Sequence, residues 1–543
     1  MADRPDPASE RGKDADYLIV GAGSAGCVLA ARLSEDPSVR VCLLEAGGPD
    51  TSVLIRAPIG FAFGGPLGVN TARYKTVPQP ALDGRSGFQP RGKVLGGSSA
   101  INAMVYCRGN ASDYDGWAAA GNPGWDYASV LPFFKRAEHN DCVGANEFRG
   151  VDGPLRVGHL RSPFPINDAF LAACESQGIA RTPDYNGARQ EGCWPAQVTQ
   201  SGGERWSAAR AYLTPNRGRA NLQVITGAQA LRVRIEQSRA VGVDVEIDAK
   251  PRTIRARRAV ILAGGAYGSP QLLMCSGVGP AAQLREHGIE VQHDLPGVGQ
   301  NLQDHITATL SWRSPRPDGT LGMSAAGLAR LARGVVEWRR HRTGPITSNI
   351  AESGAFLRTR DDLHAPDIQL ALTVGIVDDH ARKRHRSHGY SLHVTLSRPK
   401  SRGEVRLVSA DARTPLAIDP RYLSDPDDLP TLVEGVQRAM AIMQAPALRA
   451  WRGPMLYPVD ASDPADIARE IRRSADTEYH PSGTCRMGPA SDPLAVVDHE
   501  LRVHGIDALR VVDASIMPAL TTGNTNAPVI MIAEKAAGQL RAS

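Results

Sequence analysis

The chain has 543 residues and a mass of 57.9 kDa, which exceeds one ordinary hydrophobic core, so two or more subdomains are expected. Hydrophobic residues make up 42% and charged residues 22%, the composition of a soluble globular protein. The net charge of +5 is small for this length and only 5% of residues are aromatic, which argues against a nucleic-acid-binding protein.

The N-terminal residues and the cysteines bear on location. Residues 1–16 are polar and lack the apolar core of a signal peptide, and no run of 18 apolar residues predicts a transmembrane segment. The eight cysteines are scattered and form no CxxC pair. The sequence therefore predicts a reduced, cytoplasmic protein without a metal site.

The first predicted elements are a strand, a glycine-rich turn, a helix and a second strand. The apolar run 16–20 ends at GAGSAG, residues 21–26, and residues 27–33 have helical character. A β-rich run over 39–44 then ends at Glu45. This order and spacing are typical of a dinucleotide-binding βαβ unit.

Each residue type in that unit has a physical role. Gly21 permits a tight turn, Gly23 lets the backbone approach a pyrophosphate, and Gly26 lets the helix pack closely on the sheet. Glu45 is placed to bind a ribose hydroxyl. The pattern does not distinguish NAD from FAD.

Residues 90–109 read PRGKVLGGSSAINAMVYCRG. The Gly-Gly-Ser-Ser stretch over 96–99 offers backbone amides and two hydroxyls, which suit an anion or a flat ring. Alternatively, Ser98 or Ser99 caps a helix over 100–106. Both interpretations stay open, because a capped helix N-terminus is itself an anion site.

Three further segments carry structural expectations. Residues 58–90 are rich in glycine and proline, which predicts a long connection and suggests a lid over the substrate entrance. Residues 328–342 predict a basic, solvated helix packed on the substrate domain, in preference to a membrane-binding helix. Residues 378–393 contain four histidines among basic residues, which predicts an exposed loop rather than a metal site.

Several blocks resemble, in order, those of the glucose–methanol–choline (GMC) oxidoreductase family. They are GAGSAG with Glu45, GKVLGGSSAINAMVYCRG, GGAYGSPQLLMCSGVG at 264–279, GVGQNLQDH at 297–305, SRPKSRG at 397–403 and the run from 501 to 518. The resemblance spans roughly residues 16–537 and implies FAD rather than NAD. It also implies an α/β fold, with a Rossmann-like FAD-binding domain and a substrate-binding domain that has an antiparallel sheet and helices.

The resemblance implies a discontinuous domain organisation. The FAD-binding domain is expected to comprise residues 1–158, 216–315 and 465–543. The substrate-binding domain is expected to comprise residues 159–215 and 316–464.

The same resemblance implies which residues contact the cofactor. Ile101 stands where some members carry a histidine that attaches FAD, so non-covalent binding is implied. The expected contacts are Gly21, Gly23, Ser24, Ala25, Gly26, Glu45, Ala46, Val94, Gly97, Ser98, Asn102, Ala103, Met104, Val105, Ala230, Asp513, Ala514, Asn524 and Thr525.

The stretch EYHPSGTCRMG, residues 478–488, contains the candidate reacting group. A histidine beside a proline is more often a loop residue, and Cys485 lacks neighbouring ligands for a metal. The resemblance instead places His480 on the family's catalytic histidine and Asn524 on its partner position, where members carry histidine or asparagine. A neutral imidazole suits the removal of a hydroxyl proton, and an amide can donate to the alkoxide oxygen.

Two neighbours of His480 are candidate substrate contacts. In an extended segment Glu478 would share a face with His480. Glu478 is expected either to recognise a cationic or polyhydroxy substrate, or to lie at the surface or pair with an arginine. Tyr479 is expected to pack against the pocket wall.

Together these features predict FAD-dependent oxidation of a primary alcohol to an aldehyde by hydride transfer to flavin N5. The expected electron acceptor is O2 or a quinone-like molecule. The lack of a recognisable aromatic-rich pocket argues against choline as substrate. The alternative is a same-fold hydroxynitrile lyase or another non-oxidative flavoprotein. The alcohol, the acceptor and the oligomeric state stay open.

Overall fold

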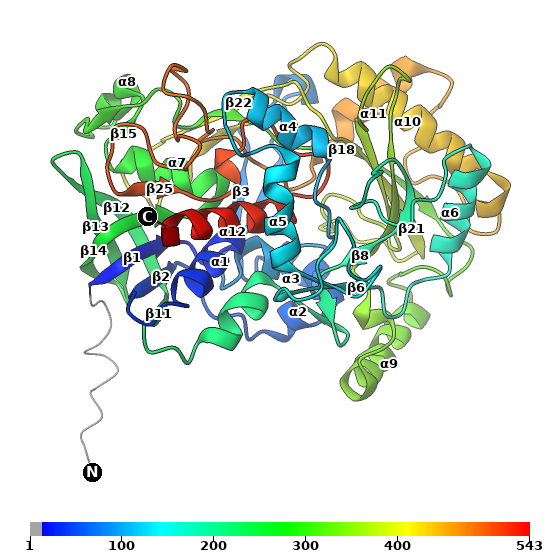
Figure 1. Cartoon of the computed structure of the whole chain (residues 1–543). Helices are drawn as coiled ribbons and strands as arrows, with labels where there is room; N and C mark the ends of the chain where they lie inside the picture. The colour runs from blue at the N-terminus through cyan, green and yellow to red at the C-terminus, as the bar shows by residue number, and fades with distance from the viewer. Residues whose placement is uncertain (1–13, 543) are drawn as a thin grey trace.

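The computed structural model describes residues 14–542. Residues 1–13, which make up most of the N-terminal stretch predicted not to be a signal peptide, lie outside the described part. The described chain forms two halves, each built on its own sheet (Figure 1). No helix within residues 14–542 has both the length and the apolar character needed to cross a membrane.

The first sheet has a parallel core. Its order is β11 (Leu222–Thr226), β2 (Val41–Glu45), β1 (Ala15–Val20), β14 (Lys250–Leu262), β13 (Arg239–Ile247) and β12 (Ala228–Glu236), with β25 (Leu509–Val511) beside β14. The pairs β11–β2, β2–β1, β1–β14 and β14–β25 are parallel, whereas β14–β13 and β13–β12 are antiparallel. Strand β1 is buried along its whole length, as expected of a parallel strand covered on both faces.

The glycine-rich turn after β1 has the conformation predicted from the sequence. Gly21 has φ +101°, and a Cβ there would lie 2.5 Å from the carbonyl oxygen of Ala263. A Cβ on Gly26 would lie 1.9 Å from the carbonyl oxygen of Gly21. The tight turn and the close packing of helix α1 (Ser24–Leu33) therefore both require glycine.

The two ends of the chain meet in this half. Helix α12 (Asn526–Ala542) packs on α1, and Figure 1 shows the red C-terminal helix beside the blue N-terminal elements. Glu534 of α12 is fully buried and accepts hydrogen bonds from Arg32 of α1 at 2.9–3.0 Å and from Tyr212 at 2.8 Å. The pairing satisfies a buried carboxylate that would otherwise be costly.

The second sheet is antiparallel throughout. Its order is β24 (Asp476–Thr477), β18 (Ile306–Arg313), β21 (Gly389–Leu396), β20 (Ile368–Thr373), β19 (Ala351–Leu357) and β7 (Gly192–Pro195). Helices α6 (Ile166–Ser176) and α10 (Asp428–Gln444) pack on it. The domain division expected from the sequence groups β18 and β24 with the FAD-binding segments, whereas both strands pair within this second sheet.

The remaining elements connect or flank the two sheets. The helices are α2 (Val53–Arg56), α3 (Phe61–Leu67), α4 (Ala111–Ala119), α5 (Tyr127–Ala137), α7 (Gly265–Cys275), α8 (Ala281–Glu286), α9 (Ala325–His341) and α11 (Pro464–Ser474). The smaller sheets include β3 (Thr71–Lys75) with β4 (Phe88–Gly92), β5 (Glu138–Asn140) with β6 (Leu155–His159), and β22 (Gly403–Arg406) with β23 (Ala417–Asp419).

The structure differs from one expectation and from one open alternative of the sequence analysis. Residues 58–90 are not a structureless connection, because they contain α3, β3 and the start of β4. The helix over 100–106 is absent, and only a single 3-10 turn over Gly97–Ala100 forms. The Ser99 hydroxyl donates to the Gly96 carbonyl at 2.6 Å, and the Asn102 side chain accepts the Met104 N–H at 3.1 Å. Such local side-chain bonds compete with helix formation.

Candidate active site

A cavity of about 1100 Å³ lies between the two halves and is lined by both. It is lined by the glycine-rich turn of the first sheet and by His480 and Asn524 on the side of the second. All residues predicted from the sequence to contact cofactor or substrate line it, except Gly26 and Val94, which are buried elsewhere. The structure thus gathers the predicted residues around one space, while their roles there stay predictions.

At the glycine-rich end, the wall is made largely of backbone. Helix α1 begins at Ser24, and its N-cap residue Gly23 supplies no side-chain cap. Because Gly23, Ser24 and Ala25 line the cavity, uncapped N–H groups at this helix terminus are available to an anion. A Cβ on Gly97 would lie 2.7 Å from the Cα of Gly23, so the two glycine loops meet without room for a side chain.

Glu45 completes this end of the cavity. Its carboxylate accepts the N–H groups of Ala22 at 2.9 Å and Gly47 at 2.8 Å. Burial raises the pKa of Glu45, and the two backbone donors oppose that rise. The side chain is therefore fixed at the cavity wall, and its predicted contact with a ribose hydroxyl stays a prediction.

These residues fit an FAD molecule. The uncapped helix N-terminus suits the pyrophosphate, and Glu45 suits the ribose. The stretch of Asn102 to Val105 also lines the cavity, whose volume of about 1100 Å³ leaves room for a large ligand.

At the opposite end, His480 and Asn524 meet although 44 residues separate them. The Nδ2 of Asn524 lies 3.2 Å from the Nε2 of His480. The backbone N–H of His480 donates to Asp304 at 2.9 Å. The same Asp304 carboxylate accepts hydrogen bonds from the hydroxyl groups of Tyr422 at 2.5 Å and Thr477 at 2.6 Å. A buried hydrogen-bond network therefore fixes the backbone of His480.

Strand register explains why these groups converge. In the second sheet, Ile306 pairs with Thr477 and Thr307 with Thr395, while Thr395 also pairs with Gln369. The start of β18, the end of β21, the start of β20 and the end of β24 therefore lie at one edge of the sheet. The residues that follow or precede these strand ends are brought together there.

His305 is one of the site residues that the sequence analysis did not identify. It lies just before β18, and its Nδ1 is 2.9 Å from the Nδ1 of His480. Its Nε2 is 3.0 Å from the carbonyl oxygen of Ser397, at the end of β21. A carbonyl oxygen only accepts, so the Nε2 of His305 carries the proton and donates it.

This anchor determines the tautomer of His480. Burial lowers the pKa of His305 to about 4, so the ring is neutral near pH 7 and its Nδ1 is an acceptor. His480 must then donate through Nδ1–H, which leaves a lone pair on its Nε2, facing Asn524.

The electrostatic surroundings keep His480 neutral. Burial lowers its pKa well below the ordinary 6.5, and repulsion from His305 and Arg91 lowers it further. Desolvation disfavours the charged form of an imidazole, so His480 is an unprotonated base near pH 7.

Asn524 is oriented by a third residue. Gln369 of β20 donates from Nε2 to the Oδ1 of Asn524 at 3.3 Å. The amide nitrogen of Asn524 is thereby turned toward His480 and can donate a hydrogen bond there.

Glu478 and Tyr479 both make side-chain contacts with histidines of the second half. Glu478 is neither a surface residue nor paired with an arginine: its carboxylate accepts from the Nδ1 of His393 at 3.1 Å. Tyr479 lies in the wall as expected, with φ +69° and its hydroxyl 2.5 Å from the Nδ1 of His380. Because His380 also contacts Asp476 at 3.0 Å, the loop over 378–388 is held against the cavity rather than simply exposed.

One pattern in the sequence could have pointed to the missed groups. His305 and Asp304 end the block GVGQNLQDH, whose polar residues precede the apolar strand β18. Gln369 and His393 sit singly within buried strands, and only the strand register brings them to the site.

Comparisons with known proteins define the class. Two models described as GMC oxidoreductase match residues 15–307 and 399–533. The chain is 46% identical to an alcohol dehydrogenase [acceptor] of Pseudomonas putida, covering 96% of this chain and 95% of that one. It is 44% identical to an oxygen-dependent choline dehydrogenase of Brucella anthropi, covering 97% and 95%.

Solved structures agree with this fold. Pyridoxine 4-oxidase from Mesorbium loti matches with a TM-score of 0.88 at 34% identity, covering 98% of this chain and all of that one. Formate oxidase of Aspergillus oryzae RIB40, in a study of FAD modification, matches with a TM-score of 0.91 at 25% identity, covering 98% of both chains.

Fold and site thus define an FAD-dependent oxidoreductase acting on CH–OH donors. The chain belongs to the GMC oxidoreductase family. The family, the fold class and FAD as cofactor, all predicted from the sequence, are confirmed.

Proposed function

We propose that this chain oxidises a primary alcohol to an aldehyde, with the Nε2 of His480 as the base and Asn524 as the donor to the alkoxide oxygen. The observation that carries the proposal is the hydrogen-bonded chain from the Ser397 carbonyl through His305 to His480. This chain leaves an unprotonated nitrogen at the cavity wall beside an amide donor.

His480 and Asn524 have different roles toward the substrate hydroxyl. A hydroxyl placed between them donates its proton to the Nε2 of His480 and accepts a hydrogen bond from the Nδ2 of Asn524. The amide dipole stabilises the charge that develops on oxygen and does so at any pH, since it does not titrate. When bound, FAD supplies the acceptor for the hydride that leaves the carbinol carbon.

The cofactor is proposed to bind without a covalent link. The contacts proposed for it are those predicted from the sequence, with Gly26 and Val94 supporting the wall rather than lining it. Ile101 lines the cavity and offers no nucleophile. Precipitating the holoenzyme with acid should release all flavin into the supernatant, and flavin retained in the pellet would contradict this part.

An uncharged alcohol suits the cavity better than a cationic one. Glu478 is already bonded to His393, and the guanidinium groups of Arg73 and Arg382 lie over the ring of Phe88 at 5.8 and 4.7 Å. Phe88 also lines the cavity, so these cations occupy an aromatic face that a quaternary ammonium would otherwise use.

The test is flavin reduction without air. When the holoenzyme is mixed anaerobically with benzyl alcohol or 1-butanol, the absorbance of its oxidised flavin should disappear. His480→Ala should lower the reduction rate by roughly 10²–10⁴, the range for loss of a general base. The matched control is His504→Ala, which removes a histidine that contacts the Gly488 carbonyl and does not line the cavity.

Either of two results would overturn the proposal. One is an unchanged reduction rate in His480→Ala with full flavin content. The other is a parent enzyme whose flavin no alcohol bleaches, which would favour the non-oxidative alternative, such as cleavage of a cyanohydrin.

A further inference from the structure

Exposed apolar side chains gather at one part of the surface. Among residues 14–542, nine large hydrophobic side chains are exposed, and six of them come from only two segments. The six are Val53, Leu67, Val69, Leu328, Val335 and Val336, with exposed fractions of 37–62%. Isolated exposed apolar residues need no explanation, but such a concentration does.

These two segments also form the rim of the cavity. Phe63 and Gly65 of α3 and Leu331 of α9 are partly exposed and line it. The segments touch each other, since Trp338 of α9, Ala57 and Ile59 belong to one small apolar cluster against which Phe63 and Leu331 pack. Figure 1 shows α9 projecting from the body on the same lower side as α2 and α3.

Helix α9 has three distinct sides. One side packs on the protein through Gly327, Leu331, Gly334 and Trp338, whose indole N–H donates to the Gly203 carbonyl at 2.7 Å. These four residues are sufficient to explain how α9 packs on the rest of the protein. A second side carries the exposed residues Leu328, Ala332, Val335 and Val336 at helical spacing, and no described residue covers it.

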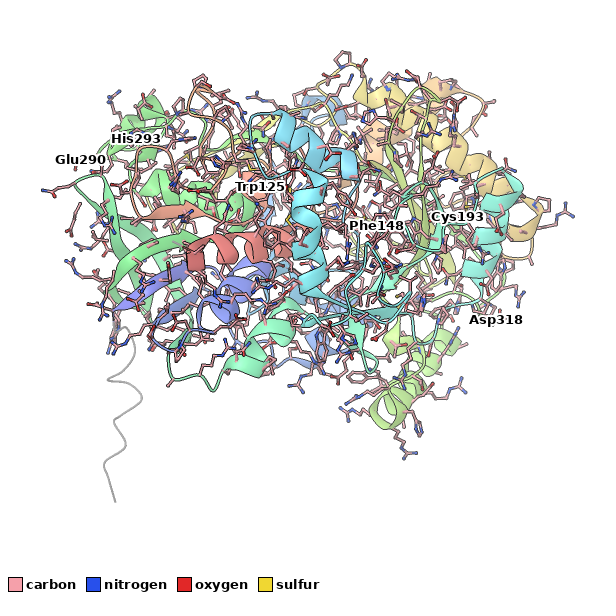
Figure 2. All side chains as sticks on the ribbon, in the orientation of Figure 1. Trp125, Phe148, Cys193, Glu290, His293 and Asp318 are labelled. Atoms are coloured by element: carbon pink, nitrogen blue, oxygen red, sulfur yellow. The ribbon has the colours of Figure 1, made fainter. Side chains whose placement is uncertain are left out.

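The third side is basic and carries Arg333 and Arg340, while Arg339 follows Val335 and Val336 by one helical turn on the apolar side. All three arginines are exposed, and none makes an ion pair with any residue in 14–542. Over residues 325–342 five arginines face a single acid, Glu337. Arg330 is bound differently, donating to the carbonyl of Asp318, which Figure 2 shows at the outer edge of the molecule.

We propose that this rim surface, formed by the six apolar residues with Arg333, Arg339 and Arg340, binds an anionic lipid bilayer. A helix with an apolar side next to a basic side lies in the interface, with its apolar residues among the acyl chains and its cations at the headgroups. A second copy of the chain fits less well, since a two-fold contact would bring these unpaired arginines against one another.

The proposal rests on the proposed function and deepens it. With the rim seated on lipid, the cavity opens toward a phase that dissolves apolar alcohols and lipid-soluble electron acceptors. The site would then exchange its reactants with the bilayer as well as with water. It also revises the expectation from the sequence that α9 is only a solvated packing helix.

The experiment is sedimentation of the intact holoenzyme with vesicles. Vesicles of equal parts phosphatidylcholine and phosphatidylglycerol should carry the enzyme into the pellet, and pure phosphatidylcholine should carry far less. The combined variant Leu328→Ser, Val335→Ser, Val336→Ser should lower partitioning on the order of tenfold or more, because apolar burial drives insertion. Arg333→Glu with Arg340→Glu should abolish the preference for phosphatidylglycerol.

The matched control changes three equally exposed apolar residues elsewhere: Val143→Ser, Val408→Ser and Leu494→Ser. This control should sediment like the parent. Equal partitioning of the rim variant and the control overturns the proposal, as does a parent that stays in the supernatant. A parent dimer that the rim variant converts to monomer, without vesicle binding, would assign the surface to self-association instead.

Failure of this proposal is distinguishable from failure of the proposed function. All of these variants should keep the parent's rate of anaerobic flavin reduction by a water-soluble alcohol in the absence of lipid. A protein that binds vesicles but is not reduced would contradict only the alcohol oxidation.

Discussion

The two ends of the cavity are built in different ways. The glycine-rich end is backbone from a continuous stretch after β1, closed by a second glycine loop at Gly97. The reacting end is made of the side chains of His305, Gln369, His480 and Asn524, together with the backbone carbonyl of Ser397. The glycine-rich end is determined by a short continuous stretch of sequence. The reacting end depends on the pairing of strands that are far apart in the chain.

That difference predicts different responses to mutation. A side chain added at Gly21, Gly26 or Gly97 meets backbone atoms at 1.9–2.7 Å, so cofactor binding and folding should fail together. A side chain removed at the reacting end should leave flavin bound and change only the chemistry.

The largest effect should come from Gly21→Ala. The new Cβ would lie 2.5 Å from the Ala263 carbonyl oxygen, at φ +101°. We expect purified protein with little or no flavin, measured by absorbance per mole of protein, and a lower melting temperature. Gly144→Ala is the matched control, because it has φ +71° but nothing within 4 Å. Full flavin content in Gly21→Ala would contradict the conclusion that the glycine-rich end tolerates no added side chain at this position.

Two asparagines near the start of α12 allow a sharper test. Asn524→Ala should retain flavin but lose roughly 10²–10³ in the reduction rate, as on removal of a donor to a developing oxyanion. Asn526 instead accepts from Ser24 at 2.7 Å, at the glycine end. Asn526→Ala should weaken flavin retention by about tenfold, the equivalent of one hydrogen bond, with a smaller change in reduction rate. If Asn524→Ala lost flavin and Asn526→Ala lost only reduction rate, the assignment of these residues to the two ends of the cavity would be wrong.

The smallest rate effect, and the most specific one, is expected for His305→Ala. The reduction rate should fall by on the order of tenfold, because His480 loses the partner that fixes its tautomer. The pH profile should also move. The base must be unprotonated, so the rate falls as pH drops through the pKa of His480, which in the parent lies well below 6.5.

Without His305, water reaches the imidazole and one source of repulsion is gone. The pKa of His480 should rise, and the acidic limb of the rate profile should move to higher pH. His305→Gln, which can still accept from the Nδ1–H of His480, should recover part of both changes. An unshifted acidic limb in His305→Ala would mean that His305 has only a packing role.

Prediction from sequence succeeded where structure is local. The glycines at 21 and 26 and the acid at 45 are read from spacing, because a strand, a turn and a helix in succession have one compact arrangement. The alternative of a helix over 100–106, which the structure does not show, arose in a region where serine and asparagine side chains bond to nearby backbone, which helix capping rules do not resolve.

The reacting end could be predicted only in part. His480 and Asn524 were identified by resemblance, but their partners were not, because the pairing of Thr307 with Thr395 and of Thr395 with Gln369 spans distant segments. The pairing of Glu478 with His393 was missed for the same reason, since His393 reads as one more residue of a buried strand.

The burial of Glu534 between Arg32 and Tyr212 has a consequence for synthesis of the protein. Helix α12 docks on α1 through this contact, and Asn524 lies two residues before its first residue. During translation the N-terminal βαβ unit is available early, whereas the reacting end cannot be completed until the last helix leaves the ribosome. Under the proposed mechanism, a chain that ends before Asn524 lacks the base–amide pair, so it should not support alcohol oxidation.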